Sequence, residues 1–546
     1  MSPTSSDSSP WLPLQNRLFR TIWIASLVSE MGGWMQDVGS GWLITSLSSS
    51  PSMVALVEAA NTLPVMLLAL PAGALADIVD RRQLLIAVQV YALLTAGALA
   101  VLTWFHMTTG WVLLAFTFAL GVSEALTLPA RTATVPELVA RAQMPAAVAL
   151  NSVSINGSRA VGPAIAGLLI SMSGPWLVFA LNALSYIGVV YVLLRWRRDH
   201  RKSSLPAERF LSAMRVGMRF VLHTPALQGV LIRGAAFFGF AASTWSLFPL
   251  VVRRELGRGP KVYGLLLACI GLGAVVGALL LPRVRPRVSR DSLVGGATAL
   301  YALAALALAW LHNLALLSVA MILTGVAWIS ILSALQVAAQ LTLPEWVRAR
   351  GLAAFVVIFM AGMALGSILW GQVATHTGIP AALTYAALGM AFLGFLTWRI
   401  KLGSHEGLDL QPSLDWPAPI LAERPEPDSG PVLVTTEYRV RPEKRAAFLK
   451  AMQAVGEMRR RNGAFFWELF HDSADTTRFI ECFMDESWIE HLRQHERASV
   501  ADRQIRERAY WLLIGGKPTE ASHWLPDSFP SRAADNGDDR PLESRT

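Results

Sequence analysis

Ionisable side chains interrupt several long apolar stretches of this 546-residue chain. A charge at the centre of a membrane helix costs ~2.5–3.5 kcal/mol on insertion scales, so each such residue is a candidate functional group. A buried carboxyl group can take up and release a proton, and an arginine can bind an anionic group of a ligand. The candidates are Glu30, Asp37, Glu58, Glu124, Arg159 and Arg233.

The first apolar stretch contains the segment SEMGGWMQDVGSGW, in which Glu30, Trp34 and Asp37 are spaced i, i+4, i+7. On a helix this spacing puts the three side chains on one face. We expect that face to look into a polar cavity in which Asp37 or Glu30 carries protons. The alternative is that both carboxylates lie near the membrane interface and are simply solvated.

Three further charges have different settings. Glu58, in VALVEAAN, lies deeper in its apolar stretch and is a second candidate for proton coupling. Glu124, in GVSEALTLPAR, is as well placed to pair with Arg131 as to carry protons. Arg233 is a further charge within an apolar stretch.

The segment NSVSINGSRAVGPAIAG places Asn156 and Arg159 about one helical turn apart. Arg159 is expected to bind an acidic group of a substrate or to neutralise a carboxylate of the cavity; a structural ion pair is the alternative. The same segment contains residues that favour close helix packing and a bend, namely Gly162, Pro163 and Gly167.

The composition indicates a membrane protein. The chain is 53% hydrophobic and 16% charged with a mean hydropathy of +0.44, whereas soluble domains have about 25% charged residues. The net charge is +9, and the basic excess lies in residues 1–402. This distribution favours contact with anionic lipid headgroups over nucleic-acid binding. Two cysteines, Cys269 and Cys482, predict neither a disulfide framework nor a cysteine-rich metal site.

Twelve stretches are long enough to cross a bilayer, which takes about 20 apolar residues. Lysine and arginine gather at alternate ends of these stretches, and cytoplasmic loops retain positive charge. Both termini are therefore predicted to be cytoplasmic in a bacterial inner membrane. The exceptions share one loop and are Arg253, Arg254, Arg258 and Lys261. The predicted spans are 20–46, 52–75, 82–105, 110–130, 146–171, 176–196, 226–250, 262–282, 291–312, 314–341, 351–375 and 379–399.

An internal repeat relates the two halves of the apolar region. VPELVARAQMPAAVA begins at Val135, after the fourth span, and LPEWVRARGLAAFVV begins at Leu343, after the tenth. Two duplicated six-helix halves are typical of secondary transporters, whose substrate site lies between them near the bilayer midplane. Between the halves, residues 206–222 alternate arginine with apolar residues at helical spacing. We expect an amphipathic helix on the inner leaflet there, or else a solvated linker.

Beyond the spans, residues 401–428 are rich in proline and predict a linker. Residues 429–525 follow a β-α-β-β-α-β order, which is ferredoxin-like and resembles small antibiotic-biosynthesis monooxygenase domains. That resemblance implies a possible dimer; catalysis and ligand sensing stay open. His491 and His495 are spaced i, i+4 and could hold a metal, but a third ligand is missing and a structural role is expected.

The motif GALADIVDRR resembles the loop between the second and third helices of the major facilitator superfamily, through Gly73, Asp77, Arg81 and Arg82. More narrowly, PAGALADIVDRRQLL, PARTATVPELV and the C-terminal extension resemble bacterial siderophore and drug exporters of the enterobactin-exporter type. The resemblance covers residues 15–525. It implies that this loop braces one conformation of the two halves. Ile78 and Asp80 depart from the usual motif, which has arginine and glycine there.

The sequence therefore predicts an all-α membrane protein with twelve transmembrane helices in two six-helix halves, plus a small α+β ferredoxin-like domain. The predicted divisions are 1–15 (disordered), 16–196, 197–225 (loop), 226–400, 401–428 (linker), 429–525 and 526–546 (disordered).

The predicted function is export of amphipathic small molecules, such as siderophores or drugs, by alternating access and proton antiport. The chain has no GxxxxGK[ST] motif, which disfavours ATP-driven transport. Expected partners are the substrate, protons and membrane lipid, without nucleic acid, metal or cofactor. The alternatives are an importer of the same fold and a membrane-tethered oxygenase whose helices deliver a substrate to the C-terminal domain. Export by a chain ending at residue 402 would count against the oxygenase.

Overall fold

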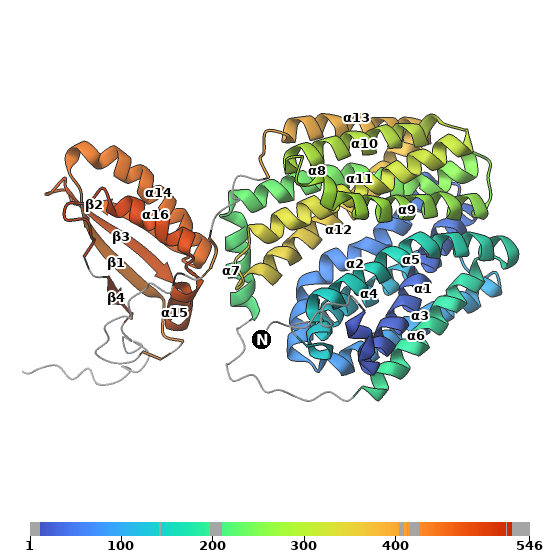
Figure 1. Ribbon diagram of the computed structural model, residues 1–546, viewed down its shortest axis with the longest axis horizontal. Coiled ribbons are helices and arrows are strands. Elements are labelled where there is room, and N and C mark those ends of the chain that lie inside the picture. The colour runs from blue at the N-terminus through green and yellow to red at the C-terminus, as the bar shows by residue number, and fades with distance from the viewer. Residues whose placement is uncertain are drawn as a thin grey trace, which may run out of the picture. The chain divides into compact units, whose positions relative to one another are not determined.

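The computed structural model describes residues 11–140, 143–196, 210–402, 409–411, 413, 425–426, 428–519 and 521–526. The chain forms two compact units (Figure 1). Unit 1 comprises Met1–Ser212 and Pro225–Glu406, and unit 2 comprises Ala213–Thr224 and Gly407–Thr546. The predicted disordered tail 526–546 lies outside the described residues except for its first residue, as do residues 1–10 of the N-terminal tail.

Six helices form the first half of unit 1. Asn16 starts α1 by accepting hydrogen bonds from the N–H groups of Leu18 and Phe19, as helix N-caps do. The segment just before it, Leu12–Gln15, is a 3-10 helix (η1), so the prediction of disorder up to residue 15 was wrong. The helices are α1 Arg17–Leu47, α2 Pro51–Ile78, α3 Arg81–Trp104, α4 Gly110–Leu138, α5 Met144–Ser173 and α6 Pro175–Arg195.

The second half repeats this arrangement. Proline is the first residue of α8 and α9. Proline lacks a backbone N–H, and no hydrogen bond is lost there because the N–H of the first helical residue has no partner within the helix. The helices are α8 Pro225–Leu250, continued by a π-helical turn η3 Val251–Glu255, then α9 Pro260–Val284, α10 Arg290–Trp310, α11 Leu314–Leu341, α12 Arg348–Thr377 and α13 Ile379–Thr397.

These helices match the predicted spans and extend most of them by a few residues. Among the described residues, 11 helices are long and apolar enough to cross a membrane. Of the twelve helices that match predicted spans, α1 is the one outside this set, and it contains Arg17, Arg20, Glu30 and Asp37. The duplicated segment covers the junction of α4 and α5 in one half and the junction of α11 and α12 in the other, and each copy runs into the helix that follows.

The halves pack together along two helix pairs, α2 with α12 and α5 with α9. Glycine permits the second contact. A Cβ atom at Gly264 would lie 2.4 Å from the carbonyl oxygen of Pro163, and one at Gly271 would lie 2.5 Å from the Cα of Ala160. A buried apolar cluster spans both halves and includes Ile44, Phe179, Phe248, Leu266 and Met321.

Unit 2 contains a four-stranded antiparallel sheet with strand order β2-β3-β1-β4, the ferredoxin-like arrangement predicted from the sequence. Phe448 and Met452 of α14 pack with Ala509 of α16 against Tyr438 and Phe479 of the sheet. The elements are β1 Val432–Arg439, η4 Pro442–Lys444, α14 Arg445–Asn462, β2 Phe466–His471, β3 Arg478–Asp485, α15 Trp488–Arg497, α16 Val500–Tyr510 and β4 Ser522–Trp524.

The helical region before β4 is divided in two, which the sequence did not predict. Ala498 has an extended backbone and ends α15, and Ser499 starts α16 through a capping box with Asp502. Part of the predicted linker also belongs to this unit, because the chain at Gln411 and Ser413 is hydrogen-bonded to Val500 and Ala498. Residues 403–408 and most of 412–427 lie outside the described residues.

Helix α7, Phe210–Leu222, corresponds to the helix predicted over residues 206–222. Its residues from Ala213 onward belong to unit 2. Arg219 donates hydrogen bonds to the carbonyl oxygen of Gly463 and to a carboxylate oxygen of Glu486, both at 2.9 Å. The polar face of α7 is therefore engaged by the C-terminal domain, a contact that helical periodicity alone does not predict. Residues 206–209 lie outside the described residues.

Candidate functional site

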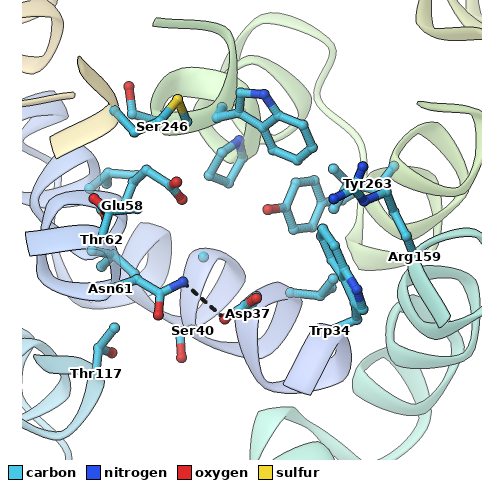
Figure 2. Close-up of a pocket in the computed structure, with 18 of the residues that line it drawn as sticks. Trp34, Asp37, Ser40, Glu58, Asn61, Thr62, Thr117, Arg159, Ser246 and Tyr263 are labelled. Atoms are coloured by element: carbon cyan, nitrogen blue, oxygen red, sulfur yellow. Dashed lines mark hydrogen bonds between the residues drawn. The ribbon is translucent and has the colours of Figure 1, made fainter. Parts of the chain in front are cut away.

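A cavity of about 210 Å³ lies between the two halves of unit 1 (Figure 2). Four predicted site residues line it: Trp34, Asp37, Glu58 and Arg159. Asp37 comes from α1 and Glu58 from α2, so the cavity holds two carboxylates from adjacent elements. The two carboxylates share this cavity because α1 and α2 pack beside each other, not because the residues are close in the chain.

Asn61 adds a polar group that the sequence analysis missed. It lies three residues after Glu58 and therefore shares its face of α2. Its side-chain nitrogen donates a hydrogen bond to Asp37 at 3.4 Å, the interaction drawn in Figure 2. The spacing of a carboxylate and an amide on one helix face was a signal that could have identified it.

Aromatic residues form much of the remaining wall. They come mainly from the second half, where Trp245 on α8 and Trp328 on α11 have ring centroids 5.4 Å apart. Such a wall offers a large apolar surface to a ligand, while the few polar groups orient it. No periodicity marked these residues as cavity-lining. The aromatic lining consists of Trp34, Trp245, Tyr263, Trp328 and Phe359.

Glu30 does not line this cavity, which corrects the prediction that it shares the site with Asp37. It accepts hydrogen bonds from Arg131 and from the Ser154 hydroxyl, both at 2.9 Å. Seven residues of helix span about 10 Å, so Glu30 lies at another height along α1 than Asp37 and contacts partners on α4 and α5 instead. Glu124, for which pairing with Arg131 and proton transfer were both open, is exposed and is not among the cavity-lining residues.

Asn156 and Arg233 also lie away from the cavity. The side chain of Asn156 donates to the carbonyl oxygen of Ser152 at 2.8 Å, within its own helix. Arg233 is 4% exposed and is paired with Asp291, and it donates to the carbonyl oxygen of Ile400. Arg233 of α8 therefore binds Asp291 of α10 and the chain just after α13. Asp291 was not identified from the sequence.

The residues of the loop motif make contacts within the first half. Arg82 donates to the carbonyl oxygens of Leu193 and Leu194 at the end of α6, both at 2.8 Å. Asp80 caps α3 by accepting from the N–H of Gln83. For Gly73 a side chain would meet nothing within 4 Å, and the side chain of Asp77 lies outside the described residues.

The loop after α8, whose positive charges were exceptions to the predicted distribution of lysine and arginine, makes hydrogen bonds between the two halves. Arg253 donates to the hydroxyl of Thr45 at 2.9 Å and lies over the ring of Trp42, 5.4 Å from its centroid. Arg254 donates to the carbonyl oxygen of Ser49. These arginines bind the end of α1, which gives a physical reason for positive charge in a loop where it was not expected.

The predicted packing residues of α5 lie at close helix contacts. A Cβ atom at Gly162 would lie 2.9 Å from the Cβ of Trp34, and one at Gly167 would lie 2.6 Å from the carbonyl oxygen of Pro260. Pro163 is inside the helix. The segment thus brings α5 against α1 on one side and α9 on the other.

Unit 2 contains a cluster of histidines. His491 bonds Asp485 through Nδ1 at 3.0 Å, and its ring centroid lies 4.6 Å from that of His495 and 4.8 Å from that of His523. Burial lowers the pKa of His495 to about 2 and that of His523 to about 4, and the neighbouring His491 adds to both shifts. In the described part of the chain, no group of three or more side chains is arranged to hold a metal.

Comparison with known proteins agrees with this architecture. The profile of the transmembrane secretion effector family matches residues 8–529, and the chain belongs to this family of major facilitator superfamily transporters. It is 24% identical to the staphyloferrin A transporter of Staphylococcus aureus over 390 residues, 70% of this chain and 97% of that protein. It is also 24% identical to the multidrug efflux pump Tap of Mycobacterium tuberculosis, over 73% of this chain and 96% of that protein.

Solved structures show the same fold. A bacterial homolog of the human lysosomal transporter Spinster, inward-facing and unoccupied, superposes with a TM-score of 0.58 at 15% identity, covering 72% of this chain and 98% of that one. A bacterial homologue of the iron transporter ferroportin, also inward-facing, gives a TM-score of 0.53 at 14% identity, covering 71% and 99%. These structures show the fold, and the family match makes the protein a multi-span membrane transporter for small molecules.

Proposed function

We propose that this transporter exports amphipathic small molecules, siderophore-like or drug-like, by alternating access coupled to inward movement of protons. The observation that supports it best is the cavity between the halves, which combines Asp37 and Glu58 with an aromatic wall. The similar proteins named as a siderophore transporter and a multidrug efflux pump support the direction and the substrate class.

The two carboxylates are the proposed proton carriers. In an apolar cavity an ionised carboxylate is costly, so protonation and substrate binding can compete for the same site. Moving one charge through ~100 mV supplies ~2.3 kcal/mol. Since ~1.4 kcal/mol is a tenfold ratio, one proton sustains a substrate gradient on the order of 50-fold.

The proposed orientation has both termini in the cytoplasm of a bacterium and the protein in the plasma membrane. The basic residues at alternate helix ends support it. Arg253 and Arg254 then bind the end of α1 at the outer side, so the halves are joined there by hydrogen bonds.

Inside-out vesicles test the function. Adding a transported amphipathic dye should release protons from energised vesicles that contain the wild type. Asp37→Asn and Glu58→Gln should each reduce this release at least tenfold. The control is Glu345→Gln, which removes a carboxylate that is 87% exposed. Proton release that persists at the wild-type level in both cavity variants would contradict proton coupling by these residues.

A further inference from the structure

Arg159 is a cation of the cavity, and among the described residues no acidic side chain is paired with it. Its guanidinium lies over the ring of Trp34, 5.2 Å from the centroid. Its Nε atom is buried and has no hydrogen-bond partner in the described part of the chain. Arg233, an arginine of the span formed by α8, is by contrast paired with Asp291. The residue as a whole is half-buried. A half-buried cation without a counter-charge is still costly, so Arg159 is a residue whose partner is still to be supplied.

The carboxylates of the cavity do not supply it. No ion pair within 4.0 Å joins Arg159 to Asp37 or Glu58, all three being described residues. In Figure 2, Arg159 and Trp34 lie on one side of the cavity, and Glu58 and Asn61 lie on the other. The cavity therefore has a cationic side on α5 and an acidic side at Glu58 on α2, with Asp37 of α1 between them.

We infer that the cavity binds substrates that carry a carboxylate beside an apolar or aromatic body, and that Arg159 binds this carboxylate. The inference rests on the proposed function and names its substrate class. A guanidinium matches a carboxylate through two parallel N–H···O bonds, which an ammonium cannot reproduce. Trp34 holds the guanidinium plane from one face, and Trp245, Trp328 and Phe359 receive the apolar body.

This assignment separates two tasks within one cavity. Arg159 recognises the anionic group, whereas Asp37 and Glu58 carry the protons. A substrate with only a positive charge would be repelled by Arg159. Acidic amphiphiles are therefore the expected class, and neutral analogues of the same shape should bind more weakly.

A matched pair of probes tests the inference on the purified full-length protein in detergent. The probes are 1-naphthylacetate and 1-naphthylacetamide, which share one ring system and differ in charge; binding is measured by calorimetry at pH 7.5. Wild type should bind the acetate about tenfold or more tightly than the amide, the fold-change expected for a charge-assisted hydrogen-bond pair. Arg159→Gln should remove this preference and leave amide binding within about twofold.

Arg159→Lys serves as the second variant and should retain part of the preference, because it keeps the charge and loses the paired geometry. Thermal melting confirms that each variant is folded. Equal binding of both probes by wild type would overturn the inference, as would an equal loss of both probes in Arg159→Gln. Because equilibrium binding needs no gradient or membrane, its outcome is independent of the vesicle assay, and the proposed export can fail while the anion site stands.

Discussion

Glu30 and Arg131 show how a residue that resembles a proton carrier can be held in a structural pair instead. The two side chains are joined at 2.9 Å and are 16% and 33% exposed. Ser154 completes the coordination of the carboxylate. Asp37, on the same helix, has an amide as its hydrogen-bond donor and lines the cavity. The difference between these two acids lies in what neighbouring helices place beside them.

Removing one partner of this pair should therefore affect stability. Arg131→Met leaves Glu30 with the hydroxyl of Ser154 alone and should destabilise the protein by about 1–3 kcal/mol. The double variant Glu30→Gln/Arg131→Met should recover part of that loss, because no unpaired charge remains. Thermal unfolding in detergent measures both, and strictly additive effects of the two substitutions would exclude the coupling.

The histidine cluster makes a pH-dependent prediction for unit 2. The pKa of His523 is lowered from its ordinary value of 6.5 to about 4, chiefly by burial. The unfolded chain then binds more protons than the folded chain below pH 6.5, so the stability of the domain falls as pH drops from 6.5 toward 4.

His523→Gln should flatten that fall in stability between pH 6.5 and pH 4. The measurement is amide hydrogen exchange of β1 and β4 in the full-length protein across this pH range, corrected for intrinsic exchange rates. His471→Gln, at an exposed histidine of the same domain, is the control. Unchanged pH dependence in His523→Gln would show that the buried imidazole does not titrate differently on unfolding.

At the scale of elements, α5 combines several roles along one helix. It carries Arg159 into the cavity, and its glycines allow α1 and α9 to approach. With a β-branched or long apolar residue at Gly167, α5 would stay apolar but could no longer pack closely against α9. Packing between the halves therefore depends on the absence of a side chain, which hydropathy does not measure.

Gly167→Ala and Gly157→Ala form a matched test on this helix. A Cβ at Gly167 would lie 2.6 Å from the carbonyl oxygen of Pro260, whereas one at Gly157 meets nothing within 4 Å. Gly167→Ala should lower stability by about 1–3 kcal/mol through overpacking and reduce transport. Gly157→Ala should be neutral or slightly stabilising, since alanine favours helix. The melting temperature and the rate of dye efflux are measured for both variants. Equal values for the two would contradict the close contact between Gly167 and α9.

At the scale of the whole molecule, the duplication sets where chemistry can occur. Pseudo-symmetric halves place a cavity between them, yet their contributions differ. The first half supplies Asp37, Glu58 and Arg159, and the second supplies most of the aromatic wall. The C-terminal unit adds a second level of organisation, because α7, which lies between the halves in sequence, contacts it through Arg219.

The proposed orientation can be checked by cysteine labelling in a variant whose Cys269 and Cys482 are replaced by serine. Met107→Cys, in the exposed loop between α3 and α4, should react with a membrane-impermeant maleimide in intact cells. Glu345→Cys, in the loop between α11 and α12, should react only after the cells are opened. The opposite pattern would invert the topology and with it the direction of proton flow.

Hydropathy and charge placement were enough to predict the twelve helices, because a bilayer requires long apolar segments whatever their neighbours are. Periodicity likewise predicted the ferredoxin-like sheet, since alternation along β1 and β3 follows directly from which face is buried. The residues Trp34, Asp37, Glu58 and Arg159 were also identifiable, because charges and their helix neighbours stand out against an apolar background.

The partners of these charges depended on tertiary packing. Glu30 and Asp37 are both acids of α1, but their height along the helix determines whether Arg131 or a cavity lies beside them. The tryptophans of the second half and the docking of α7 on the C-terminal domain were likewise not predicted. Such contacts join residues far apart in the chain, and the one-dimensional pattern records burial and periodicity but not which helix faces which.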